Sequence, residues 1–513
     1  MKKLTLSVAL AVATVVNAFA CTNLIVGKNA SADGSTIVSY SADSYGLFGE
    51  LYHYPAGMHK KGTWIDVHEW DTGKYLGRIE QARQTYNVIG NMNEFQLTIG
   101  ETTFGGRPEL VDTTGIIDYG SLIYLGLQRS RTAREAIKVM TELVQEYGYY
   151  SSGESFTIAD PNEIWIMEMI GKGPGVRGAV WVAVRVPDDC ISAHANQSRI
   201  HQFDMSDKDN CMYSPDVISF AREKGYFDGV NKDFSFAKAY APLDFGARRY
   251  CEARVWSYFN MFTARGNEFL PYILGDTDTP MPLFVKPDRK ISVQDVKNAM
   301  RDHYEGTPLD ISKDFGAGPY HTPYRLSPLS FKVGDKEYFN ERPISTQQSG
   351  FVFVAQMRST LPDAIGGVLW FGTDDANMTV FTPVYCCTDK VPVCYSRADG
   401  ADYITFSWNS SFWIFNWVAN MVYPRYDLMI GELENAFNDA QEGIESAAAK
   451  LLEKDPAKAK AFLTNYTNMT AQSTFDTWKR LGEFIIVKYN DGVVRKMKDG
   501  KFERNAIGQP AGV

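Results

Sequence analysis

Cys21 is the residue of this chain whose type and position are best suited to chemistry. It follows Ala18-Phe19-Ala20, a small-x-small pattern that signal peptidase cleaves. After cleavage there, Cys21 would carry a thiol and a free α-amine, so a nucleophile and a base would lie on one residue. The α-amine has a reference pKa of about 7.7–8.0, which leaves part of it unprotonated near neutral pH. We therefore predict that Cys21 is a nucleophile and that its own α-amine is the general base.

Residues 1–20 have the pattern of a secretory signal peptide. Lys2 and Lys3 form a short positive start, and the apolar run from Leu4 to Val16 is shorter than the roughly 20 residues that a membrane span needs. This predicts export to the periplasm or the extracellular space, without a transmembrane segment. The alternative is a lipoprotein signal with an acylated Cys21, although Ala18 stands where a large aliphatic residue is usual. Acylation would block the amine and leave a lipid-anchored binding protein.

Composition excludes some function classes. The formal net charge is −9, and −11 without Lys2 and Lys3, which does not suit nucleic acid or an anionic membrane. The apolar fraction of 44% can fill a large core. The seven histidines show no paired metal-ligand spacing, so we predict no metal site, and no motif indicates a cofactor.

Six further cysteines are present, and their state cannot be read from the sequence. An exported protein can form disulfides, but a chain of this size does not need them, so buried free thiols are an equal alternative. No pair has the C-x-x-C spacing of zinc or redox sites. These residues are Cys190, Cys211, Cys251, Cys386, Cys387 and Cys394.

The first elements of the mature chain position Cys21. The segments 22–26 and 35–41 read as strands joined by a turn rich in Asn, Asp and Gly. Cys21 would then lie at the tip of a strand, and Asp43, just past the second strand, would return to its neighbourhood. By itself, an aspartate there is more often a solvated turn residue.

Two asparagines are candidates for stabilising a developing negative charge. Asn93 lies in a polar turn between strand-like segments, and a neutral side-chain amide can direct an N–H at an oxyanion, although asparagine is also a common turn residue. Asn196 lies in the polar cluster that follows the short strand beginning at Ile191. His194 beside it allows a rival Cys–His dyad with Cys21, which we rank lower because the surroundings of Cys21 lack the papain-type context.

Further along, a capping box at Thr132 predicts an amphipathic helix, and the segments 155–158, 163–169 and 179–186 predict antiparallel strands. Residues 173–178 match G-x-G-x-x-G, but a strand and not a helix follows, so nucleotide binding is rejected.

The C-terminal part reads as mostly helical. Apolar residues from Leu433 to Leu451 trace one helical face, Asp455-Pro456 is a stop, and a further helix runs to about Leu481. We predict a catalytic domain at 21–425 with insertions and a helical region at 426–513. The stretch 240–345 is less informative, but four of its arginines could either meet a substrate carboxylate or serve the structure: Arg248, Arg249, Arg254 and Arg342.

Several segments together resemble the bacterial dipeptidase family of cysteine N-terminal nucleophile (Ntn) hydrolases, of the dipeptidase A type. The resemblance rests on Cys21-Thr22-x-x-x-Val26-Gly27, Ala32-Asp33-Gly34-Ser35, Asn93-Glu94, Ala195-Asn196-Gln197-Ser198-Arg199-Ile200, Gln356-Met357-Arg358-Ser359-Thr360-Leu361-Pro362, Ile365-Gly366-Gly367-Val368-Leu369-Trp370-Phe371-Gly372 and Lys488-Tyr489-Asn490-Asp491-Gly492. It implies an α+β fold, a four-layer αββα sandwich with two antiparallel sheets, and hydrolysis of dipeptides.

The resemblance also implies roles for single residues. Cys21 is the nucleophile, Asn93 and Asn196 match asparagines near the oxyanion, and Asp43 matches an aspartate that orients the nucleophile in the related bile-salt and penicillin amidases. That branch has R-x-x-D where this chain has Tyr40-Ser41-Ala42-Asp43, so its arginine is missing. A free peptide ammonium group needs an acidic partner, for which Asp43 and Glu101 are candidates that could equally be structural.

Three functions from different classes remain open at this stage. The first is an exported dipeptidase, and the second is an Ntn amidase acting on N-acyl substrates of the penicillin V or bile-salt type. The third is the lipid-anchored binding protein with acylated Cys21. Neither the preferred side chains nor the oligomeric state follows from the sequence.

Overall fold

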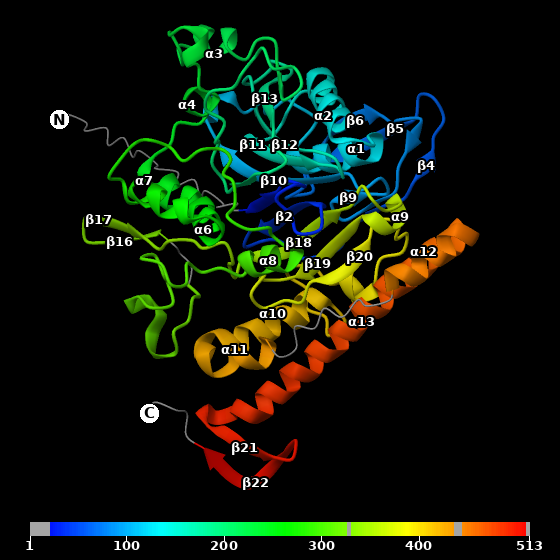
Figure 1. The fold of residues 1–513 in the computed structure, drawn as a ribbon, viewed down its shortest axis with the longest axis vertical. Coiled ribbons are helices and arrows are strands. Elements are labelled where there is room, and N and C mark those ends of the chain that lie inside the picture. The colour runs from blue at the N-terminus through cyan, green and yellow to red at the C-terminus, as the bar shows by residue number, and fades with distance from the viewer. Residues whose placement is uncertain (1–20, 326–329, 435–443, 509–513) are drawn as a thin grey trace, which may run out of the picture.

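A computed structural model describes residues 21–325, 330–434 and 444–508, and the predicted signal peptide at 1–20 lies outside these residues. Two large antiparallel sheets form the centre of the described chain (Figure 1). The first sheet contains, in spatial order, β14 (Ile191–His194), β1 (Asn23–Val26), β2 (Thr36–Asp43), β18 (Ser349–Met357), β19 (Val368–Thr373) and β20 (Thr382–Tyr385). The second contains β15 (Cys211–Tyr213), β13 (Ala179–Arg185), β12 (Ile164–Gly171), β11 (Gly153–Ala159), β10 (Thr98–Gly105), β9 (Met92–Asn93), β8 (Val88–Ile89) and β3 (His53–Tyr54).

The hairpin of β1 and β2 is present as predicted. Ile25 lies opposite Val38, and an isolated bridge joins Thr22 to Ser41, which continues the pairing to the residue after Cys21. In the turn, Asp33 accepts hydrogen bonds from the backbone and the hydroxyl of Ser35. One boundary differs from the prediction, because β2 continues to Asp43 and pairs this residue with Ser349 of β18.

The two sheets pack face to face, and the alternation along their strands decides what each residue contacts. Side chains of successive strand residues point to opposite faces. Ile25 and Tyr40 therefore lie in the core between the sheets, with Ile166 of β12, whereas Leu24 and Ile37 point to the other side of the first sheet.

The outer side of the second sheet is covered by α1 (Tyr119–Arg129) and α2 (Ala133–Tyr147). The predicted cap of α2 is confirmed, since the Thr132 hydroxyl accepts from the backbone of Glu135. The apolar face of α2 packs on alternate residues of β12 such as Trp165 and Met167. Residues 173–178 form the connection between β12 and β13, which agrees with the rejection of nucleotide binding there.

Helices α6 (Ala253–Phe262) and α8 (Val293–Ala299) cover the outer side of the first sheet, where their apolar residues pack in one cluster with Leu24 and Ile37. The helices α10 (Ser411–Val422) and α13 (Pro456–Tyr489) pack on β19 and β20, and apolar residues of α10 join the cluster that contains Phe353 and Phe371. Figure 1 shows α1 and α2 on one side of the paired sheets and α8 on the other. The chain is thus of mixed α+β class with antiparallel sheets.

The C-terminal region is mainly helical, as predicted, but its boundaries differ. The structure has α11 (Tyr426–Glu434) and α12 (Ile444–Lys454), and the part of the predicted helical face at 435–443 lies outside the described residues. Asp455 ends α12 and caps α13, whose first residue is Pro456. The helix α13 continues to Tyr489 and is followed by a hairpin that was not predicted, β21 (Val494–Lys498) and β22 (Lys501–Gly508).

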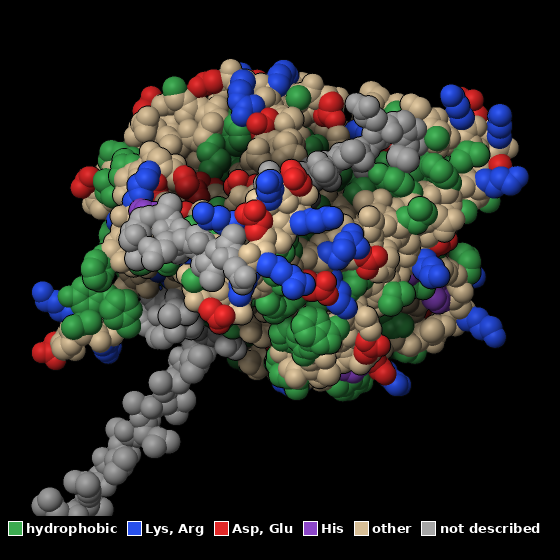
Figure 2. Space-filling model, turned by 90° about the horizontal axis from the view of Figure 1, so that it is seen from below, with side chains coloured by type: hydrophobic (Ala, Val, Ile, Leu, Met, Phe, Trp, Pro, Cys, Tyr) green, Lys and Arg blue, Asp and Glu red, His purple; other side chains and the backbone are tan. Residues whose placement is uncertain are grey.

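The remaining helices and strands are short. They are β4 (Gly57–Met58), β5 (Trp64–His68), β6 (Tyr75–Glu80), β7 (Gln84–Thr85), α3 (Ser219–Glu223), α4 (Phe236–Tyr240), α5 (Phe245–Ala247), α7 (Leu270–Leu274), β16 (Ser330–Val333), β17 (Lys336–Phe339) and α9 (Asp363–Gly366). In the described part of the chain, no helix combines the length and the apolar character needed to cross a membrane. Basic and acidic side chains lie interspersed on the face seen in Figure 2.

Candidate active site

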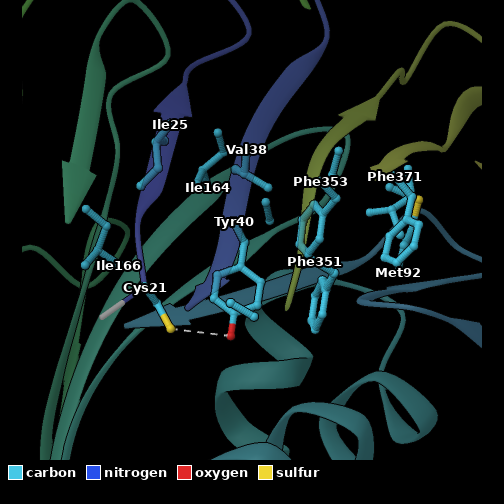
Figure 3. Packing of buried hydrophobic residues seen from close by; sticks show 14 of the residues in the cluster. Cys21, Ile25, Val38, Tyr40, Met92, Ile164, Ile166, Phe351, Phe353 and Phe371 are labelled. Atoms are coloured by element: carbon cyan, nitrogen blue, oxygen red, sulfur yellow. Dashed lines mark hydrogen bonds between the residues drawn. The ribbon is translucent and has the colours of Figure 1, made fainter. Parts of the chain in front are cut away.

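Cys21 lies in the core between the two sheets, at the entry to β1. Its side chain is buried, and its sulfur is 3.7 Å from the hydroxyl of Tyr40 on β2 and 3.4 Å from Oε1 of Glu101 on β10. Figure 3 shows the thiol pointing at the Tyr40 hydroxyl, with Phe351 and Phe353 on the other side of the tyrosine from Cys21. Both sheets therefore contribute a polar group to the surroundings of the sulfur.

Glu101 is a buried carboxyl group with one free oxygen. Its Oε1 accepts the hydroxyl of Tyr40 at 2.5 Å as well as the thiol of Cys21. Its Oε2 has no hydrogen-bond partner among the described residues. Burial raises the pKa of Glu101 to about 7, against the lowering effect of the hydrogen bonds from Tyr40 and Cys21.

The same surroundings favour the neutral thiol. Burial raises the pKa of Cys21 well above its usual value, and the charges of Glu101 and Asp43 raise it further. A thiol held protonated near neutral pH is a weak nucleophile, because the thiolate is the reactive form. Attack by this sulfur therefore needs a base that removes its proton.

Asp43 is held by three donors at the end of β2. Its Oδ2 accepts from Arg342 at 2.8 Å and from Ser41 at 2.9 Å, and its Oδ1 accepts from Ser349 at 2.5 Å. Burial raises the pKa of Asp43, and the charge of Arg342 opposes this effect. Asp43 is thus near Cys21, as the predicted hairpin requires. The R-x-x-D motif would place an arginine at Tyr40, and in this chain Arg342 forms the ion pair with Asp43 instead.

Asn196 is connected to Cys21 through a buried arginine. Arg254 of α6 donates to the carbonyl of Cys21 at 2.7 Å and to Oδ1 of Asn196 at 2.9 Å. The amide of Asn196 in turn donates to the carbonyl of Thr103 on β10 at 2.8 Å. Asn196 itself has a positive φ of 61°, a conformation that asparagine tolerates better than most residues. The arrangement fixes the backbone at Cys21.

The structure uses Asn93 to hold a turn. Its Nδ2 donates to the carbonyls of Leu127 and Ser130 at the end of α1, at 2.8 and 2.7 Å. Its Oδ1 accepts from the backbone of Phe95 and Leu97. Both amide hydrogens are therefore bonded to backbone carbonyls, and in this arrangement neither is left for an oxyanion.

His194 is also bonded away from Cys21. One ring nitrogen lies 2.7 Å from the hydroxyl of Thr102 and the other 2.6 Å from that of Thr157. Burial lowers the pKa of His194 to about 3, so the ring is neutral. With both nitrogens in these hydrogen bonds, the rival Cys21–His194 dyad does not form here.

Two further arginines that the sequence offers as substrate ligands form ion pairs within the protein. Arg248 and Arg249 pair with Asp278 and Glu341. All seven cysteines are buried free thiols, so of the two alternatives, disulfides or free thiols, the structure contains free thiols. In the described residues, no group of three or more His, Cys, Asp or Glu is placed to hold a metal ion.

Two cavities lie on the Tyr40 side of the thiol. A small one of about 30 Å³ is lined by Tyr40, Tyr119 and Phe351, among other residues. A larger one of about 310 Å³ is lined by Asp71 and Tyr403 and shares Tyr52 and Trp70 with the small one. Cys21 is not among the lining residues of either cavity, and Tyr40, whose hydroxyl lies 3.7 Å from the sulfur, is the wall of the small cavity nearest to it in these contacts.

Three important neighbours of Cys21 were missed or given too little weight by the sequence reasoning. Tyr40 was noted only as the residue in place of an arginine, and Glu101 and Arg254 only as candidates for binding substrate. A period-two pattern puts Tyr40 and Glu101 on the inner faces of their strands, which is the signal that was available.

Comparison with known proteins places the chain in a family. Residues 20–53 and 48–439 match peptidase family C69. A probable dipeptidase of Salmonella dublin is 31% identical over 386 residues, which cover 71% of this chain and 81% of that protein. A probable dipeptidase of Latilactobacillus sakei is 27% identical over a region that covers 87% of this chain and 90% of that protein. Dipeptidase A of Lactobacillus helveticus is 25% identical over a region that covers 81% of this chain and 84% of that protein. The chain belongs to peptidase family C69.

Proposed function

We propose that this chain is an exported cysteine dipeptidase whose nucleophile is Cys21, the first residue after removal of residues 1–20. The observation that carries the proposal is the position of Cys21, whose sulfur lies between Tyr40 and Glu101 at the entry to β1. The match to the peptidase family starts at residue 20, directly before it. The names of the similar proteins support dipeptides as substrates.

The reaction follows from a terminal cysteine. The α-amine of Cys21 takes the thiol proton, and the sulfur attacks the carbonyl carbon of the peptide bond. The C–N bond breaks as the ammonium of Cys21 returns a proton to the leaving amine, which leaves a thioester. Water, activated by the same amine, then hydrolyses the thioester and frees the thiol. The raised pKa of the Cys21 thiol is the reason that this base is needed.

The other site residues serve this reaction by position. Arg254 holds the carbonyl of Cys21 and is itself held by Oδ1 of Asn196, and the pair of Asp43 and Arg342 holds the end of β2 beside Cys21. We assign Asp43 and Asn196 to positioning the nucleophile. The sequence predicts Asn93 as an oxyanion donor, whereas its hydrogen bonds to the carbonyls of Leu127 and Ser130 favour a role in holding the turn, and the alanine variant described below distinguishes the two roles.

The proposed fold is the four-layer αββα sandwich of Ntn hydrolases. Two antiparallel sheets packed face to face, with helices on both outer sides, support this assignment. Within it, we propose a catalytic domain at 21–425 and a helical region at 426–513. The helix α13 packs on β20 and α10, so this region is attached to the first sheet.

A substrate panel tests the function. We expect hydrolysis of free dipeptides, and much slower hydrolysis of an N-acetyl dipeptide and of a pentapeptide containing the same bond. Measurement of kcat/KM for each compound decides the question. Equal values for all three would refute a dipeptidase, and faster hydrolysis of the acylated compound would favour the amidase. Mass spectrometry of the mature N-terminus tests the third function, since an acylated Cys21 would indicate a lipid-anchored protein.

Replacement of Asn93 by alanine separates its two roles. From its hydrogen bonds in the turn, we expect Asn93→Ala to lower the free energy of unfolding by about 1–3 kcal/mol, because buried backbone partners are left unpaired. Turnover of the folded variant should remain near that of the wild type. Denaturant unfolding and kcat are measured together. A loss of turnover of roughly 10²–10³-fold at unchanged stability would instead establish Asn93 as an oxyanion donor.

A further inference from the structure

The geometry of a dipeptide restricts where its free amino group can bind. The α-nitrogen is two bonds from the scissile carbonyl carbon, a distance of about 2.5 Å. The attacking sulfur approaches that carbon to about 3–3.5 Å. In a dipeptidase of the proposed function, on which this inference rests, the ammonium group therefore lies within about 6 Å of the sulfur of Cys21.

The carboxyl groups of Glu101 and Asp43 both raise the pKa of the Cys21 thiol, but of these two only Glu101 has an oxygen without a hydrogen-bond partner among the described residues. Both oxygens of Asp43 are bonded to Arg342, Ser41 and Ser349. Glu101 has its Oε1 at 3.4 Å from the sulfur, and its Oε2 has no partner among the described residues. A buried acceptor without a partner costs free energy, which an ammonium donor would recover.

The small cavity is connected to Glu101 through Tyr40, which lines the cavity and donates its hydroxyl to Oε1 of Glu101, whereas Glu101 itself is not one of its lining residues. The cavity's volume of about 30 Å³ is close to the space that one water molecule occupies in the liquid. Aromatic rings attract cations to their faces, and most of the lining is aromatic. The aromatic lining residues are Tyr40, Tyr52, Tyr54, Trp70, Tyr119 and Tyr124.

A second carboxyl group lies at the outer side of this cavity. The hydroxyl of Tyr119 donates to Asp71 at 2.9 Å, and Asp71 lines the larger cavity of about 310 Å³. Asp71 thus adds a second carboxyl group where the two cavities adjoin at Tyr52 and Trp70.

We propose that Glu101 binds the α-ammonium group of the substrate, with the rings of Tyr40 and Tyr119 beside it, and that this contact restricts the enzyme to peptides with a free amino terminus. Glu101 would be a specificity-determining residue in contact with substrate. An N-acyl group would remove the positive charge and add bulk where the cavity has none to spare.

The charges around Glu101 agree with a site for a cation. The ionisable groups that interact with Glu101 lie on several neighbouring elements. They are Cys21 before β1, Tyr40 and Asp43 on β2, Asp71 after β5, Tyr119 at the start of α1, Tyr149 after α2, and Glu154 on β11. The cations Arg254 and Arg342 act on Asp43 and already have carboxylate or carbonyl partners. An arriving ammonium group would be the positive charge that this cluster lacks.

This arrangement also predicts how peptide binding depends on pH. Burial raises the pKa of Glu101 to about 7, so its carboxylate form, which pairs with ammonium, gains population as the pH rises through that value. The peptide's own ammonium group loses its proton near pH 8, from its reference pKa of about 7.7–8.0. Affinity for a free dipeptide should therefore rise from about pH 6 to between pH 7 and 8 and then fall.

Binding to Cys21→Ala tests the proposal without hydrolysis. The probes are alanyl-alanine and propanoyl-alanine, which differ only in the amino group, and calorimetry measures both affinities. We expect the free dipeptide to bind roughly 10- to 150-fold more tightly, the range for a lost charge-assisted contact. Adding Glu101→Gln should bring the two affinities to within about twofold of each other. Three results would overturn the proposal. In Cys21→Ala, the two compounds could bind with equal affinity, or the free dipeptide could fail to bind. The third is that adding Glu101→Gln leaves the ratio of the two affinities unchanged.

A matched control and a second readout keep the result clear. Glu154 is another buried glutamate with an unpartnered oxygen, on the adjacent strand β11, and it has no hydrogen bond to Cys21. Glu154→Gln should keep the discrimination. If Glu101→Gln fails to fold, the pH dependence of the affinity ratio in Cys21→Ala decides, and a ratio independent of pH between about 6 and 8 contradicts the proposal.

The outcomes also distinguish this site from the proposed function. Discrimination in binding without any dipeptide hydrolysis by the wild type would refute the dipeptidase and retain the ammonium site. If the wild type hydrolyses alanyl-alanine and propanoyl-alanine with equal kcat/KM, the chain would still be a peptidase, but the proposed ammonium site at Glu101 would be refuted.

Discussion

A chain that keeps one additional, uncleavable residue in front of Cys21 is expected to have no measurable dipeptidase activity. The nitrogen of Cys21 would then be an amide, which cannot accept the thiol proton. Burial and the neighbouring charges of Glu101 and Asp43 raise the pKa of the thiol, so it would not ionise by itself near neutral pH. Both ring nitrogens of His194 are engaged by threonines, so this residue would not replace the amine.

The comparison uses two forms of one protein. A site-specific protease recognition sequence that ends directly before Cys21 gives an extended form, and cleavage gives a form that begins at Cys21. The kcat/KM of a free dipeptide is measured before and after cleavage. Activity should appear only with the released cysteine, and wild-type turnover by the extended form would refute the α-amine as the base.

Replacement of Cys21 by alanine is expected to lower dipeptide turnover by roughly 10⁴- to 10⁶-fold, the scale seen when a covalent nucleophile is removed. Stability should change little, because alanine removes a single sulfur atom whose hydrogen bonds with Tyr40 and Glu101 are as long as 3.7 and 3.4 Å. Activity assays and thermal unfolding are measured on the same preparations.

Cys190→Ala is the matched control for this variant. Cys190 is also a buried free thiol, but its hydrogen bond is with the side chain of Asp189, away from Tyr40 and Glu101. Its replacement should leave kcat/KM within about twofold of the wild type. Turnover by Cys21→Ala comparable to that of the control would show that another group performs the attack.

The local parts of this site could be predicted because short-range chemistry determines them. The Asp33-Gly34 turn between apolar segments predicts the hairpin that brings Asp43 back beside Cys21. The amphipathic helix after Thr132 follows from its cap and its periodicity.

The long-range parts could not be predicted in the same way. Glu101 reaches Cys21 because two sheets pack face to face, and Arg342 reaches Asp43 across a sequence separation of 299 residues. Neither contact leaves a trace in the periodicity of a single segment. Asn93 shows the converse, since its position in a polar turn is compatible both with an oxyanion donor and with the turn-holding hydrogen bonds that the structure contains.

The most direct measurement on the central claim is the titration of activity against alkylation of Cys21. The enzyme is treated with increasing amounts of iodoacetamide, and mass spectrometry of its peptides determines which thiols are modified. We expect the remaining dipeptidase activity to fall in direct proportion to the modified fraction of Cys21, and a free dipeptide to protect this residue. The other six cysteines are buried like Cys21, and the extent of their modification should not correlate with the loss of activity. Full activity in an enzyme whose Cys21 is completely alkylated would contradict the assignment of this thiol as the nucleophile.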